Sequence, residues 1–82
     1  MANANLANAN LSNANLSNAN LYNAFLFEAN LTNANLSYAN LTGANLPYAS
    51  LLYTNLTGVT LTGATGCSTV SGATLTAPPC AN

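Results

Sequence analysis

Few side chains in this 82-residue chain have the chemistry of a catalytic or metal-binding group. Glu28 is the only acidic residue, Cys67 and Cys80 are the only cysteines, and Lys, Arg, His and Asp are absent. Ser-His-Asp, Cys-His and paired-carboxylate arrangements therefore cannot be assembled within one chain. Glu28 and the two cysteines also lack a fourth ligand and the usual spacing of a zinc site. We expect a protein that is not an enzyme, with no catalytic residue, metal, cofactor or small-molecule substrate.

The two cysteines lie near the end of the chain, outside its repetitive region. In an oxidising compartment such a pair is expected to form a disulfide, and free thiols or an intermolecular bridge are the alternatives. The chain begins Met-Ala-Asn-Ala-Asn-Leu, which has neither the basic nor the apolar segment of a secretory signal. Either an export signal has been removed, or the protein is cytoplasmic and its thiols are reduced. We favour the first and expect an extracellular or cell-surface protein.

The chain carries almost no charge, with a formal net charge of −1 at pH 7. Binding of nucleic acid through its phosphates needs Lys and Arg, so this class of function is excluded. No apolar run is long enough to span a bilayer, because polar residues interrupt the sequence every few positions. Weak electrostatic repulsion between copies favours their association.

Leucine recurs at every fifth position through most of the chain, usually with alanine two residues earlier and asparagine between them. The leucines predicted to form the core are Leu6, Leu11, Leu16, Leu21, Leu26, Leu31, Leu36, Leu41, Leu46, Leu51, Leu56 and Leu61. A spacing of five drifts around a helix and changes faces on a strand, so neither continuous element can bury them all. A coil that turns one corner per five residues can bury all of these leucines. Four such five-residue units would close one turn of about twenty residues.

The repeating unit, for example Ala9-Asn10-Leu11-Ser12-Asn13, resembles the consensus of the pentapeptide-repeat protein family, Ala-(Asp/Asn)-Leu-x-x. The resemblance covers about residues 2–65. It implies an all-β solenoid, a right-handed quadrilateral β-helix, which this length would wind into about three turns of four pentads. It also implies an inward leucine or phenylalanine with a small residue two positions earlier.

The repeat ends near residue 65. Gly66 stands where the next leucine is expected, and Pro78 and Pro79 are incompatible with a continued regular element. We therefore predict that residues 66–82 form a C-terminal cap or docking tail, closed by Cys67 and Cys80.

The outward side chains suggest two kinds of contact. The asparagines that precede the leucines would stack from turn to turn, where their amides can hydrogen-bond along the axis as they do in fibrils. Outward aromatic side chains can anchor a binding surface or pack laterally on the solenoid, and the sequence favours neither. These aromatic residues are Tyr22, Phe25, Phe27, Tyr38, Tyr48 and Tyr53.

The function that the sequence favours is a structural subunit that stacks head to tail into a homo-oligomeric filament. The repeat starts at residue 2, so its first turn is expected to expose unpaired backbone groups and an open apolar end, which solenoids normally cover. The candidates for the axial interface are Asn3, Asn5, Leu6, Asn10, Leu11, Leu61, Val70 and Leu75. A small ice- or surface-binding solenoid is the alternative. A further alternative carried over from the family, a DNA mimic that binds topoisomerases, needs an acidic surface that this chain lacks.

Overall fold

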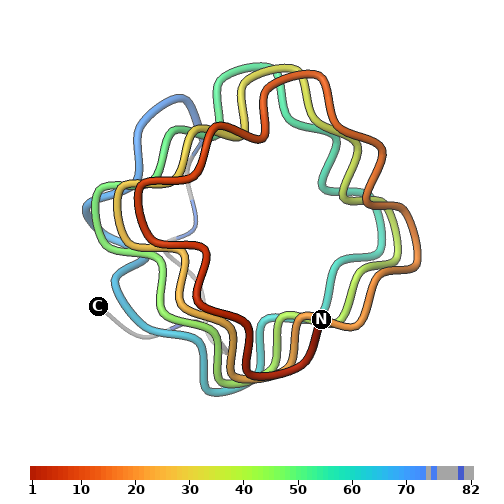
Figure 1. Ribbon diagram of the computed structural model, residues 1–82, viewed down its shortest axis with the longest axis vertical. Coiled ribbons are helices and arrows are strands. Elements are labelled where there is room, and N and C mark those ends of the chain that lie inside the picture. Colours follow the sequence, from red (N-terminus) through yellow and green to blue (C-terminus); the bar gives the residue numbers. More distant parts are fainter. Residues whose placement is uncertain (74, 76–79, 81–82) are drawn as a thin grey trace.

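A computed structural model describes residues 1–73, 75 and 80 of the chain. The backbone winds into four-sided coils of twenty residues, with residues 1–20, 21–40 and 41–60 as the first, second and third coils. These coils lie over one another when viewed along the axis (Figure 1). Among the described residues there is no helix and no extended strand, and hence no helix that could span a membrane. The sheet consists instead of isolated parallel bridges between successive turns: Asn5–Phe25, Asn10–Asn30, Asn15–Asn35, Asn20–Asn40, Phe25–Asn45, Asn30–Ser50, Asn35–Asn55, Asn40–Thr60, Asn45–Thr65 and Ser50–Ser71.

Each corner of the coil is a tight turn that begins at a leucine position. The leucine carbonyl accepts a hydrogen bond from the N–H three residues later, as between Leu21 and Ala24 at 3.0 Å. The third residue of the turn has a positive φ, the requirement of a type II turn. Asparagine and glycine, which tolerate this conformation best, occupy most of these positions, for example Asn33 and Gly43. The turn explains why one corner recurs every five residues.

Successive coils are joined by three kinds of backbone hydrogen bond on each side. The N–H of the positive-φ residue of each corner donates to the coil that follows, as from Asn23 to the Thr42 carbonyl at 2.8 Å. The leucine N–H donates to the coil that follows, as from Leu21 to the Asn40 carbonyl at 2.8 Å. The N–H of the bridging residue donates to the coil that precedes, as from Asn40 to the Ala19 carbonyl at 2.9 Å. All of these bonds run along the coil axis, so the ladder continues wherever another coil is present.

The core is a column of leucine and alanine along the axis. Each pentad points these two side chains inward and the residue between them outward, since successive residues of an extended segment face opposite sides. The leucines of the middle of the coil are buried: Leu21, Leu26, Leu31, Leu36, Leu41, Leu46 and Leu51. Leu6, Leu11 and Leu16 at one end, and Leu56 and Leu61 at the other, are only partly buried.

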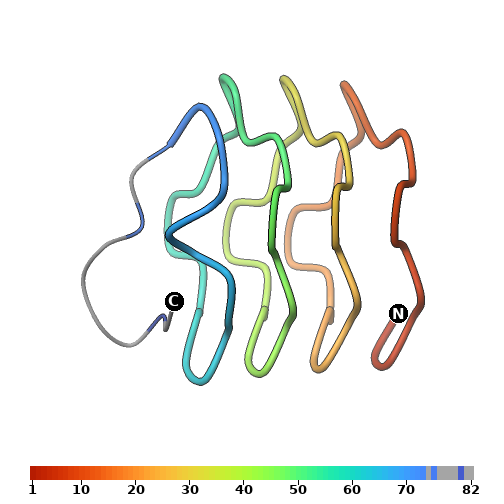
Figure 2. The same ribbon diagram turned by 90° about the vertical axis from the view of Figure 1, so that its left-hand side faces the viewer.

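The regular spacing changes after Thr65. Bridged residues up to Asn45 and Thr65 are twenty apart, whereas Ser50 and Ser71 are twenty-one apart, so the last segment contains one extra residue. The predicted tail from residue 66 therefore begins by continuing the inter-coil pairing as far as Ser71. Figure 2 shows the coils side by side, with the N-terminal coil at one end and this segment at the other. Residues 74, 76–79, 81 and 82 of the predicted tail lie outside the described residues.

Candidate assembly interface: the two ends of the coil

No pocket occurs in the structure as described, and its described residues contain no group of three His, Cys, Asp or Glu side chains that could hold a metal ion. Glu28 is exposed at a corner of the second coil, and Cys67 and Cys80 are bonded to each other. The features that could contact another molecule are therefore the lateral faces and the two ends of the coil.

The first coil has an unpaired edge. In the second coil, Phe25 donates its N–H to the Ala4 carbonyl at 2.9 Å and accepts from the Leu6 N–H at 2.8 Å, so both of its backbone groups point towards the first coil. Asn5 occupies the equivalent position one coil earlier, and so do Asn10, Asn15 and Asn20 on the other three sides. In the described part of the chain these four residues have no backbone hydrogen bond on that side.

The apolar interior is also open at this end. Leu6, Leu11 and Leu16 are partly exposed, whereas Leu26 and Leu36 in the next coil are 0% exposed. The leucines differ in exposure because each inner leucine has a neighbouring coil on both sides, whereas each leucine of the first coil has a neighbouring coil on one side only. Within the described residues, the N-terminal end therefore combines unpaired N–H and C=O groups with accessible apolar surface.

The asparagine side chains do not form the predicted ladder along the axis. Each typically accepts, through Oδ1, a hydrogen bond from the backbone N–H two residues later, as Asn10 does from Ser12 at 3.1 Å. In the described part, hydrogen bonds between two side chains of successive coils are limited to Asn45 with Thr65 at 3.4 Å and Thr32 with Ser50 at 3.2 Å. The local contact prevails because the turn brings that N–H within reach of the preceding amide.

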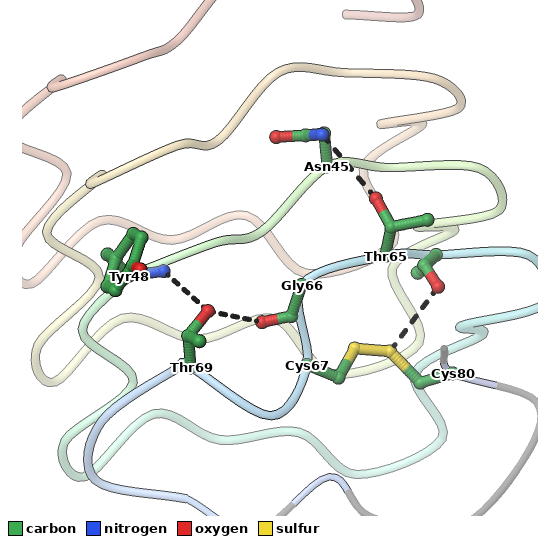
Figure 3. Close-up of a disulfide and its surroundings, with 8 residues drawn as sticks. Asn45, Tyr48, Thr65, Gly66, Cys67, Thr69 and Cys80 are labelled. Atoms are coloured by element: carbon green, nitrogen blue, oxygen red, sulfur yellow. Dashed lines mark hydrogen bonds between the residues drawn. A yellow bond between two sulfur atoms is a disulfide. The ribbon is translucent and has the colours of Figure 1, made fainter. Parts of the chain in front are cut away.

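The C-terminal end is partly covered by the disulfide. Cys67 and Cys80 are joined with Cα atoms 6.2 Å apart, which confirms the intrachain pairing among the three possibilities left open by the sequence. Cys67 is 2% and Cys80 9% exposed, and the Cys80 sulfur lies 3.7 Å from the Ala64 carbonyl oxygen (Figure 3). The bridge therefore packs on the end of the core instead of projecting into solvent.

Other contacts hold the last segment in place. The Thr69 hydroxyl accepts from the Tyr48 N–H at 3.2 Å and donates to the Gly66 carbonyl at 2.9 Å (Figure 3). Val70 and Leu75 are partly buried against the core. Among the described residues the two ends of the coil are thus unequal, because an additional segment packs on the C-terminal one.

The residues predicted for the axial interface divide between these two ends. Asn3, Asn5, Leu6, Asn10 and Leu11 belong to the first coil, and Leu61, Val70 and Leu75 lie at the opposite end. They are not brought together within one molecule. Sequence reasoning omitted Asn15 and Asn20, which complete the edge with Asn5 and Asn10 and which the five-residue spacing would have identified.

The lateral faces carry exposed aromatic side chains. Phe27 and Tyr48 belong to successive coils and meet edge to face, with ring centroids 5.9 Å apart. Tyr53 is 76% and Tyr38 64% exposed. The Phe27–Tyr48 contact is ordinary lateral packing on the solenoid, one of the two possibilities that the sequence raised.

This geometry defines a short β-solenoid: a four-sided coil with one leucine and one corner per five residues. The chain belongs to the pentapeptide-repeat family, whose model, described as pentapeptide repeats, matches residues 1–26 and 26–63. The expected fold class, a right-handed quadrilateral β-helix, is therefore confirmed. No curated protein matches the chain.

Two solved structures support the same fold. A pentapeptide repeat protein, Rfr23, from the cyanobacterium Cyanothece 51142 is 44% identical with a TM-score of 0.73, over 76% of this chain and 43% of that one. A pentapeptide repeat protein from the Arabidopsis thaliana thylakoid lumen is 25% identical with a TM-score of 0.53, over 85% of this chain and 59% of that one. The chain therefore spans less than two thirds of the length of either relative.

Proposed function

We propose that this chain is a structural subunit that assembles end to end with other copies of itself, and that repeated joining at both ends builds a filament. The observation that carries the proposal is the unpaired edge of the first coil, formed by Asn5, Asn10, Asn15 and Asn20. An open row of backbone N–H and C=O groups is a template for another β-edge. A second coil would satisfy these groups and bury the partly exposed leucines beside them.

The backbone at the opposite end supports continued growth. In the described part of the chain, the Leu56 and Gly58 N–H groups and the Thr54 and Val59 carbonyls form no hydrogen bond. In the earlier coils the equivalent groups bond to the coil that follows. Head-to-tail stacking would place the first coil of one copy on these groups.

The near absence of charge favours self-association. Glu28 is the only charged side chain, so two copies approach each other with little electrostatic repulsion. The near absence of charge also disfavours the DNA-mimic alternative, which needs an acidic surface. The ice- or surface-binding alternative has less support, because hydroxyls such as those of Thr32 and Thr42 bond to neighbouring asparagine side chains.

The test is the mass of the particles as a function of protein concentration. We expect sedimentation and electron microscopy between about 1 μM and about 1 mM to show masses that grow with concentration. The variant Asn10→Pro removes an N–H of the edge that has no partner within the chain, and should reduce association while the coil stays folded. Asn10→Ala keeps that N–H and is the matched control. Monomers at every concentration would exclude the proposal.

A further inference from the structure

We propose that one lateral corner of the coil binds an arginine side chain of a partner protein. Phe25, Phe27 and Glu28 of the second coil and Tyr48 of the third coil form this aromatic-acidic corner. Glu28 and Tyr48 occupy the same turn position in successive coils, twenty residues apart. The proposal is independent of end-to-end assembly, because the corner lies on a lateral face and not at an end of the coil.

Phe25 departs from the pattern of the repeat beside this corner. Before most corners an asparagine accepts, through Oδ1, a hydrogen bond from the N–H two residues later, as Asn20 does from Tyr22 at 3.2 Å. Phe25 cannot accept this bond, and the Phe27 N–H forms no hydrogen bond within the described residues. Burial does not explain the ring, since Phe25 is 53% exposed. An exposed apolar side chain in place of a local hydrogen bond is typical of a surface that contacts another molecule.

The two rings of the corner are accessible and held in place. Phe27 and Tyr48 meet edge to face, and both remain exposed, so an incoming cation can reach their surfaces. The Glu28 N–H donates to the Pro47 carbonyl at 2.9 Å, and the Tyr48 N–H donates to the Thr69 hydroxyl at 3.2 Å (Figure 3). These bonds fix the backbone of both coils at the corner, which reduces the entropy lost on binding.

Glu28 gives this corner the only charged side chain of the protein. Its carboxylate forms no hydrogen bond or ion pair within the described residues. Lys, Arg and His are absent from the chain, so a second copy has no basic side chain to offer. Charge complementarity therefore selects a basic segment of a different protein as the occupant.

The backbone of the corner is strained at both of its turn positions. Glu28 and Tyr48 have φ values of 58° and 61°, a conformation that asparagine or glycine adopts with less strain. Neither side chain offsets this strain through a hydrogen bond to the described residues. Residues held in such a conformation cluster at sites where their side chains bind another molecule.

The chemistry of the corner favours arginine over other cations. A guanidinium group is planar, stacks on an aromatic face and donates two parallel hydrogen bonds to one carboxylate, so Glu28 and Tyr48 can bind it together. A quaternary ammonium group is recognised by a cage of several rings, and no pocket occurs in the structure as described. Phe25 adds apolar surface beside the corner, which fits a partner with an apolar residue near its arginine.

Titration with short peptides tests the proposal. The probe is an acetylated and amidated peptide of five Arg-Gly repeats, added to the full chain and followed by the NMR signals of the Phe27 and Tyr48 rings. We expect saturable shifts with a dissociation constant on the order of 1 mM, as a single exposed cation contact provides. The equivalent Lys-Gly peptide should bind about threefold more weakly, because lysine lacks the planar fork. Rings that do not respond would overturn the proposal.

Variants of the corner identify the groups that bind. Tyr48→Asn removes the ring, and Tyr38→Asn is the matched control because Tyr38 lies at the opposite corner with the same positive φ. Asparagine suits this conformation, so both variants should stay folded. We expect Tyr48→Asn to raise the dissociation constant of the Arg-Gly peptide about threefold, and Tyr38→Asn to leave it unchanged. Equal weakening by both variants would indicate unspecific stacking and overturn the proposal.

The carboxylate is tested separately. Glu28→Gln keeps the shape of the side chain and should raise the dissociation constant about threefold at low ionic strength, with little effect at high salt. An unchanged constant at low salt, or tetramethylammonium that binds more tightly than guanidinium, would overturn the assignment to arginine. Peptide binding by a chain that stays monomeric would support the corner and exclude end-to-end assembly, and assembly without peptide binding would have the opposite meaning.

Discussion

At the scale of single residues, the corners of the coil impose the strictest requirements. The third residue of each turn has a positive φ, and the chain satisfies this with asparagine or glycine at most corners. Tyr38, Tyr48 and Tyr53 adopt the same conformation with φ between 59° and 61°, at a cost of roughly 1 kcal/mol each. Their side chains extend into solvent, so nothing in the core prevents this conformation.

Gly66 also has a positive φ, which favours glycine. A second reason for glycine at this position can be tested directly. A Cβ atom at this residue would overlap the nitrogen and ring of Pro47 in the preceding coil. We expect Gly66→Ala to reduce the free energy of unfolding by about 2–3 kcal/mol, from backbone strain and this overlap together. Gly63→Ala is the matched control, because Gly63 has a φ of +70° but its nearest atom would be 3.9 Å away. Urea unfolding of both variants measures the difference, and equal losses would contradict this explanation.

At the scale of the coil, burial depends on the number of neighbouring coils. The sequence assigns the same inward position to all of its repeated leucines, but only those with a coil on each side are fully covered. A leucine at the end of the column therefore stabilises the fold less than an identical leucine in the middle. A one-dimensional repeat protein should show this gradient of stability.

Substitutions along one column measure this gradient. We expect Leu36→Ala, in the middle coil where the side chain is 0% exposed, to cost about 3–5 kcal/mol in unfolding free energy. Leu16→Ala lies on the same side in the first coil and is partly exposed, so its cost should be less than half as large. Thermal and urea unfolding should be performed at concentrations where the chain is monomeric. Equal costs would indicate that the first coil is covered by something in solution.

At the scale of the whole molecule, the two ends differ in what holds them. The N-terminal end depends on the hydrogen bonds and contacts between the first and second coils. The C-terminal end is additionally fixed by the Cys67–Cys80 bridge, which joins residues separated by 13 positions. The two ends of the described chain are therefore held by different contacts.

Removal of the bridge tests its contribution. We expect Cys67→Ala with Cys80→Ala to lower the unfolding free energy by about 3 kcal/mol, because the unfolded chain regains the freedom of the closed loop. A thiol reductant should destabilise the unchanged chain by a similar amount and have no effect on the variant. Unfolding curves with and without reductant provide the measurement. A bridge that contributed nothing would leave all of these curves superimposed.

The sequence alone determined the coil, because a spacing of five places leucine on a single face only if the backbone turns once per repeat. The same spacing assigns Asn10 and its equivalents to the outside of the coil and Leu11 and its equivalents to the inside. The tertiary structure decided what the period cannot encode. It closed Cys67 onto Cys80, shifted the register by one residue before Ser71, and directed the asparagine amides to their own turns instead of to each other. It also made the two ends unequal, because the covering of each end depends on contacts between segments distant in the sequence and not on the local repeat.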